Sequence, residues 1–177
     1  MITITKNICN ADYYAFINYL LKKSDMFTFS VPNFGKYICP FAQERVVKYL
    51  DDGSDFLRYK KKVMPRIKKI EDHQIKMYCS EIYAGNTYDR EREIYVIKID
   101  ESLDRSFFEN VGLFDWRYPD FPEDFCFYNN GQCIMELISH EKLCFCFFVD
   151  DMLLRCLDDM NACYIEEECD GIPVLKI

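Results

Sequence analysis

Residues 125–149 read FCFYNNGQCIMELISHEKLCFCFFV, and this stretch determines the fold class. Asn129-Asn130-Gly131 is a hairpin signal, because Asn and Gly tolerate the left-handed backbone that tight turns between strands require. Glu141 and Lys142 form a second short gap between apolar runs. The sequence therefore predicts three consecutive antiparallel strands over residues 125–128, 132–139 and 143–149.

Helical periodicity dominates the N-terminal part of the chain. Apolar residues recur at helical spacing over 11–23, after Asn10 as the N-cap, and over 55–64, where Pro65 is expected to end the helix. Another helix is predicted to begin at Pro40 and to end at Gly53. A short helix is expected to start at Ser102 with Asp104 and to run to about Val111, and another is expected to run from a cap at Asp150 or Asp151 to about Met160. Further strands are expected at 2–4, 26–31, 75–79, 94–99, 164–168 and 172–177.

These elements predict an α+β fold. N-terminal helices are expected to pack on a mostly antiparallel sheet that is formed mainly by the C-terminal half. The length of 177 residues fits a single domain spanning residues 1–177.

The cysteines and the N-terminus indicate a cytoplasmic protein. The chain has ten cysteines but no Cys-x-x-Cys, and its N-terminus lacks the basic and apolar regions of a signal peptide. No apolar run reaches the roughly 18 residues of a membrane span. We therefore expect reduced thiols in the core and no contact with a membrane. With two histidines and no His-Glu-x-x-His, no metal site is predicted, and nothing indicates a cofactor.

Charge divides the chain into two unlike parts. Residues 1–99 carry 17 Lys/Arg against 12 Asp/Glu, whereas residues 100–177 carry 5 against 18. The basic stretch 58–69 could contact phosphates, but no nucleic-acid motif accompanies it, and it could equally pair with the acidic part inside the fold. We predict no nucleic-acid partner, and the acidic balance favours a protein partner with a basic surface.

The densest group of candidate site residues lies in 113–141. His140 could act as a general acid or base with Asp124 or Glu123, because its pKa lies near neutral. The alternatives are that His140 is hydrogen-bonded at a strand end and that Asp124 caps a turn. Trp116 could be a core aromatic or, with Tyr118 and Phe121, part of a recognition surface, to which Glu141 is also assigned. The hairpin should bring Asp124 and His140 together, with Trp116 close by.

The same window carries a family resemblance. Asp115-Trp116, Pro119-Asp120-Phe121-Pro122-Glu123-Asp124 and Ser139-His140-Glu141 resemble an Asp-Trp…Pro-Glu-Asp…Ser-His-Glu pattern of an uncharacterised family of small bacterial proteins. The resemblance covers roughly residues 80–148. Some members of that family look like immunity proteins of toxin systems, so the resemblance implies an immunity-type inhibitor.

Two functions follow from the sequence. The first is a cytosolic binding protein without catalytic activity, of which an immunity-type inhibitor of a toxin is one form. The alternative is a small hydrolase-like enzyme that uses His140 with Asp124 or Glu123 as acid and base. The oligomeric state is left open.

Overall fold

The three strands predicted in residues 125–149 are present and pair as predicted. β5 (Glu123–Asn129) and β6 (Gln132–Ile138) form an antiparallel hairpin, and β6 pairs antiparallel with β7 (Leu143–Cys146). Positive φ angles of 49° at Asn130 and 76° at Gly131 close the hairpin, as the Asn-Asn-Gly signal indicated. β7 ends at Cys146, three residues earlier than predicted. The computed structural model describes residues 1–33, 54–83, 86–109, 111–168 and 171–175.

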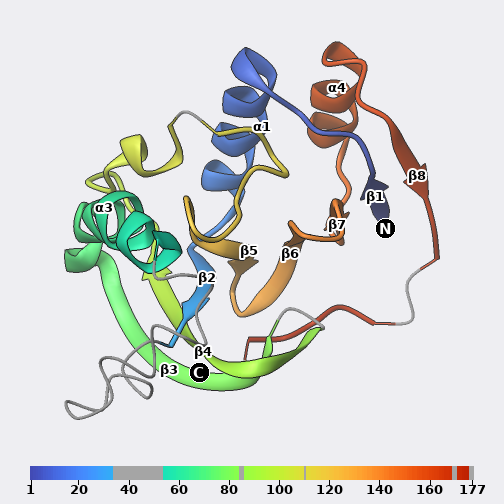
Figure 1. The fold of residues 1–177 in the computed structure, drawn as a ribbon. Coiled ribbons are helices and arrows are strands. Elements are labelled where there is room, and N and C mark those ends of the chain that lie inside the picture. The colour runs from blue at the N-terminus through green and yellow to red at the C-terminus, as the bar shows by residue number, and fades with distance from the viewer. Residues whose placement is uncertain (34–53, 84–85, 110, 169–170, 176–177) are drawn as a thin grey trace, which may run out of the picture.

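Within those residues, eight strands form one antiparallel sheet in the order β3-β4-β2-β5-β6-β7-β1-β8 (Figure 1). The remaining strands are β1 (Ile2–Ile4), β2 (Met26–Pro32), β3 (Gln74–Tyr83), β4 (Asn86–Lys98) and β8 (Tyr164–Glu166). The expectation that the sheet is formed mainly by the C-terminal half fits only in part, because β1, β2 and β3 come from the N-terminal half. β2 lies between β4 and β5, so both of its edges are hydrogen-bonded. Both of its faces are also buried, since Phe27 and Phe29 alternate with buried Thr28 and Ser30.

Three α-helices cover one face of this sheet in the described residues: α1 (Asn10–Lys23), α3 (Ser54–Lys68) and α4 (Asp151–Asp159) (Figure 1). Their apolar sides share one core with the sheet. The helices are therefore not confined to the N-terminal half. α1 begins at Asn10 with Cys9 as N-cap, and α3 continues past Pro65. The helix predicted from Pro40 to Gly53 lies outside the described residues.

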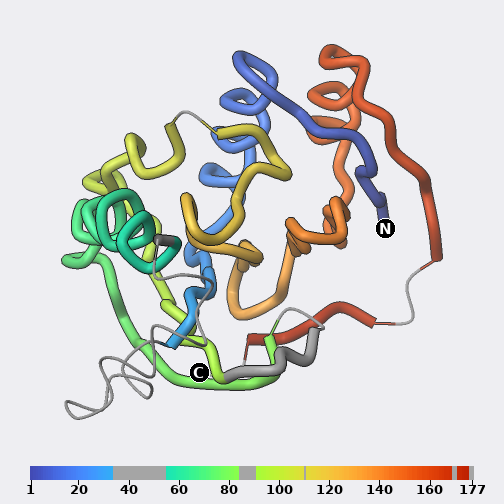
Figure 2. The backbone as a smooth tube through the Cα atoms, in the orientation of Figure 1, coloured from blue at the N-terminus to red at the C-terminus, as the bar shows by residue number. Residues whose placement is uncertain are grey.

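Short 3-10 helices join these elements at η1 (Glu71–His73) and η2 (Arg105–Phe108). Asp104 caps η2 by accepting a hydrogen bond from the Ser106 amide, so the short helix predicted from Ser102 to about Val111 is present only as this four-residue 3-10 helix. The predicted edge strand at 172–177 is reduced in its described part to a single bridge between Gln132 and Val174. Figure 2 shows this last segment running back beneath the sheet.

The opposite face of the sheet holds a second, smaller core of Tyr83, Ile94, Cys126, Tyr128 and Cys133. Eight of the ten cysteines lie in the described residues, and all eight are free thiols. Burial raises the pKa of the Cys144 thiol well above its ordinary value, so this side chain acts as a small apolar residue.

Candidate functional site

The hairpin brings Asp124 and His140 together, as the sequence predicted. The distance from His140 Nδ1 to Asp124 Oδ1 is 3.8 Å, which is longer than a hydrogen bond and forms an ion pair only when the imidazole is protonated. The two side chains differ sharply in exposure, at 47% for His140 and 1% for Asp124. Asp124 is therefore fixed by the core, whereas His140 faces solvent.

Asp124 is held by the turn that follows β6. Its Oδ1 accepts a hydrogen bond of 3.0 Å from the buried Ser139 amide, and its backbone has a left-handed φ of 51°. This is the capping role weighed for Asp124, although the capped amide lies across the hairpin. It does not lie in the loop of residues 113–122, which contains Pro119 and Pro122 and is called the Pro-rich loop below. Burial and the charge of Asp124 both raise the pKa of Glu136, a buried carboxyl on the neighbouring strand.

Glu123 and Glu141 have different partners. Glu123 Oε2 lies 2.5 Å from Arg92 Nη2, and both side chains are largely buried, so Glu123 is committed to this pair. Glu141 Oε1 lies 3.8 Å from His140 Nε2, and both of those side chains are about half exposed. His140 therefore lies between two carboxylates, those of Asp124 and Glu141. His140 and Glu141 come after the end of β6 at Ile138, so the alternation of side chains along a strand does not apply to them.

Trp116 belongs to the core. It is 1% exposed, its ring lies 4.4 Å from that of Phe125, and its Nε1 donates a 3.0 Å hydrogen bond to Tyr13 Oη. Burial raises the pKa of Tyr13 far above its ordinary value, so the phenol stays neutral and can accept this bond. The structure therefore places Trp116 in the core, which is the first of its two interpretations. Its buried ring is not part of a recognition surface.

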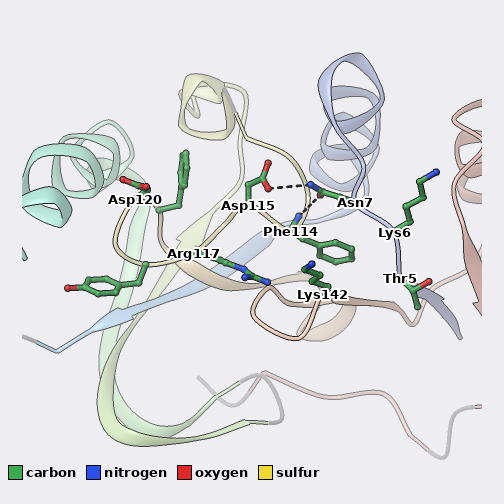
Figure 3. Close-up of a pocket in the computed structure, with 10 residues that line it drawn as sticks. Thr5, Lys6, Asn7, Phe114, Asp115, Arg117, Asp120 and Lys142 are labelled. Atoms are coloured by element: carbon green, nitrogen blue, oxygen red, sulfur yellow. Dashed lines mark hydrogen bonds between the residues drawn. The ribbon is translucent and has the colours of Figure 1, made fainter. Parts of the chain in front are cut away.

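Tyr118 and Phe121 instead line a hollow of about 590 Å³, which we call the loop hollow. It lies between the Pro-rich loop, the segment after β1 and the turn before β7 (Figure 3). Its lining is Thr5, Lys6, Asn7, Phe114, Asp115, Arg117, Tyr118, Asp120, Phe121 and Lys142. Arg117 donates from Nε and Nη2 to the Ser139 carbonyl, at 3.1 and 2.6 Å. Arg117 thereby connects the Pro-rich loop to the turn after β6 that contains Ser139 and His140.

Part of the basic stretch 58–69 pairs inside the fold. Arg58 and Lys62 of α3 both form ion pairs with Asp120 in the Pro-rich loop. Arg66 stacks over Phe121, with its guanidinium carbon 4.9 Å from the ring centroid, and donates to backbone carbonyls of η2 and the residue after it. Of the two interpretations of residues 58–69, these contacts favour pairing with the acidic residues of 100–177 over contact with phosphates.

A second hollow, of about 390 Å³, lies where α4 begins and β8 ends, and we call it the acidic hollow. It is lined by Met1, Ile2, Val149, Leu154, Glu166, Glu167 and Glu168. Glu167 accepts a 2.7 Å hydrogen bond from Thr3 Oγ1. Glu166 and Glu168 are exposed and have no ion-pair partner among the described residues.

Asp150 anchors the start of α4 beside the acidic hollow. Its carboxylate accepts hydrogen bonds from the Leu153 amide at 2.8 Å and from Tyr19 Oη at 3.0 Å, and it lies 2.7 Å from Lys23 Nζ. Burial acts to raise the pKa of Asp150, but these partners outweigh burial and hold the pKa below its ordinary value. The helix start is thus fixed to α1.

Sequence reasoning did not find Arg117, Lys142 or the residues of the acidic hollow. Arg117 follows Trp116 directly, yet only the fold shows that it reaches the Ser139 carbonyl. The run of Glu166, Glu167 and Glu168 was visible as charge, but its position beside α4 depends on the pairing of β1 with β8.

Two further observations bear on chemistry. The described residues contain no group of three or more His, Cys, Asp or Glu side chains that could hold a metal ion. None of the helices in that part of the chain could cross a bilayer, because each is too short or too polar.

No protein-family model, curated protein or solved structure matches the chain.

Proposed function

We propose that the chain is a binding protein, active in the cytoplasm, that docks a basic protein surface onto the acidic hollow and the apolar residues beside it. The observation that carries the proposal is the combination, in one lining, of apolar side chains with carboxylates that have no ion-pair partner among the described residues. Val149 and Leu154 are the apolar residues, and the exposed Glu166 and Glu168, here called the rim, supply the carboxylates.

This combination suits the side chains of a basic partner. A lysine or arginine can lay its apolar stem on Val149 and Leu154 while its charged end meets the carboxylates at the rim. Charge complementarity of this kind speeds encounter and excludes acidic competitors. The excess of Asp and Glu in residues 100–177 acts in the same direction at longer range.

Apolar residues beside the hollow extend the surface. Phe148 precedes Val149 and is 49% exposed, and Met152 in the first turn of α4 is 53% exposed. Exposed large apolar side chains that lie within five residues of each other, as Phe148, Val149 and Met152 do, are typical of contact surfaces. Because Asp150 ties this segment to α1, little ordering is needed on binding, and a pre-ordered surface binds more tightly.

Photo-crosslinking tests the proposal. A photoreactive amino acid in place of Met152 should crosslink, in cells of the source organism, to a protein with a basic surface. The matched control places the same group at Leu57, which is 68% exposed on α3. Figure 1 shows α3 on the opposite side of the molecule from α4 and β8. Adducts at residue 152 that are absent at 57 support the proposal. Identical adducts at both positions, or none at 152, contradict it.

The family resemblance suggests one specific kind of binding protein, an immunity-type inhibitor of a toxin. In that case the crosslinked protein is a toxin, and expression of the chain should protect cells that produce it. A crosslinked partner without toxicity would keep the binding function and remove the immunity role.

A second candidate, a small hydrolase-like enzyme, is favoured by the Asp124–His140 pair alone. The buried Asp124 can orient the imidazole of the half-exposed His140, which is how acid/base pairs are arranged. However, the carboxylate of Glu141 lies beside the other ring nitrogen, and His140 lines neither of the two hollows. His140→Ala distinguishes a catalytic role of the pair from a structural one. If the variant has a lower melting temperature but unchanged partner binding and unchanged hydrolysis, the role of the pair is structural.

A further inference from the structure

We propose that the loop hollow binds a small organic molecule that carries an oxyanion group, a phosphate or a carboxylate, between Arg117 and Lys142. This site is separate from the acidic hollow and does not depend on the protein partner. Four observations lead to it: the charge of the lining, the way Arg117 is held, the backbone of Lys142, and the size and walls of the hollow.

The lining is positively charged although the chain as a whole carries a net charge of -8. Lys6, Arg117 and Lys142 have no ion-pair partner among the described residues. The two acidic residues of the lining, in contrast, are already engaged. Asp120 is paired with Arg58 and Lys62 of α3, and Asp115 accepts hydrogen bonds from the Gly112 amide and the side chain of Asn7.

Arg117 is held in place by backbone carbonyls and not by a carboxylate. Nε and Nη2 donate to the Ser139 carbonyl, and Nη2 also reaches the His140 carbonyl at 3.3 Å. No carboxylate among the described residues therefore pairs with the guanidinium, and Nη1 makes no hydrogen bond within them. The Lys142 amide donates to the same Ser139 carbonyl at 3.3 Å, so the two cationic residues share one anchor. Figure 3 shows the nitrogen ends of both side chains turned toward each other below Phe114.

Lys142 occupies a backbone position that does not suit lysine. Its φ is 58°, in the left-handed region where Gly and Asn are the favoured residues. A long cationic side chain at such a position carries a conformational cost that its chemistry must offset. Pairing with an anion in the hollow supplies the reason for a lysine there.

The size and walls of the hollow suit an organic ligand. Its volume of about 590 Å³ lies in the range of small-molecule sites. Phe114, Tyr118 and Phe121 supply aromatic walls for an apolar or planar body, whereas a bare inorganic ion would leave these walls unused. The combination of aromatic walls with fixed cations therefore points to an organic anion.

Titration of the full chain with defined probes, followed by amide chemical shifts in NMR, tests the proposal. The probes are adenosine monophosphate, benzoate, inorganic phosphate and adenosine. Binding of the monophosphate or of benzoate, with shifts at residues 117 and 142 and weaker binding of inorganic phosphate, supports the site. The stronger of the two organic probes identifies phosphate or carboxylate as the preferred group. Adenosine bound as tightly as its monophosphate, or no binding of either organic anion, overturns it.

Two variants assign the binding to the hollow. Lys142→Asn removes the cation while giving the left-handed position a residue that favours it, so the variant should fold at least as well as the parent chain. It should bind the preferred probe at least about tenfold more weakly, the loss of one charge-assisted contact. The matched control Lys22→Asn removes the same charge from an exposed position near the end of α1, away from the lining, and should bind like the parent. Equal affinity in the two variants overturns the assignment.

Discussion

Replacing Asp124 by Ala should destabilise the protein by about 2–5 kcal/mol. Two contributions make up this figure. The Ser139 amide is buried and would lose the Asp124 carboxylate as its acceptor, which costs about 1–3 kcal/mol. Ala at a φ of 51° also lacks the short polar side chain that makes the left-handed region tolerable for Asp, which adds about 1–2 kcal/mol.

Asp124→Asn is the matched variant. Asparagine keeps an oxygen that can accept from the Ser139 amide, and it tolerates a left-handed backbone. It loses the charge pairing with His140, which is worth at most about 1 kcal/mol because that imidazole is half exposed. It also removes the negative charge that raises the pKa of Glu136. Asp124→Asn should therefore lie within about 1 kcal/mol of the parent chain.

Equilibrium unfolding in urea, with unfolding free energies extrapolated at a common slope, measures both variants. The reasoning is refuted if Asp124→Ala unfolds within about 1 kcal/mol of the parent chain, which is less than the lost hydrogen bond alone should cost. It is equally refuted if the Asn and Ala variants are destabilised to the same extent, because the acceptor and backbone arguments distinguish them.

Three further predictions concern stability and thiols. The pKa of Glu136 is raised above its ordinary value of 4.5 in the folded state, so the free energy of unfolding should decrease as the pH rises from 4.5 through the raised pKa. Urea midpoints measured across pH should show this decrease, and Glu136→Gln should remove it. Asp150→Ala removes the cap of α4 and should lower the free energy of unfolding by about 0.5–2 kcal/mol in the same assay. An unchanged urea midpoint would show that the cap does not stabilise the protein. A thiol reagent should count ten free cysteines in freshly prepared, denatured protein, and a count of eight or fewer would indicate disulfides.

The central hairpin could be predicted from the sequence because its signals are local. Asn129, Asn130 and Gly131 define the turn, and the apolar runs on both sides fix the strands, so β5, β6 and β7 were placed within a few residues. The proximity of Asp124 and His140 followed from that hairpin by geometry. Local caps at Asp104 and Asp150 were also visible as short polar residues ahead of apolar turns.

The arrangement of the other strands depends on contacts between distant segments, which the sequence pattern does not encode. The stretch at 26–31 was recognised as strand-like, yet nothing in it showed that β2 would lie between β4 and β5 at the centre of the sheet. Pro65 was expected to end a helix, but α3 continues to Lys68, where Ile67 packs into the core. The two hollows likewise join residues that lie far apart in the chain.

The affinity of the crosslinked partner for charge variants of the acidic hollow tests the central claim most directly. Glu166→Lys combined with Glu168→Lys reverses the rim, and Glu71→Lys combined with Glu81→Lys makes the same change at two exposed glutamates outside the hollow. We predict that the rim variant binds at least about tenfold more weakly than the parent at low salt and that added salt weakens parent binding, whereas the control binds like the parent. Equal affinity of the rim variant and the control at low salt would contradict the proposed docking surface.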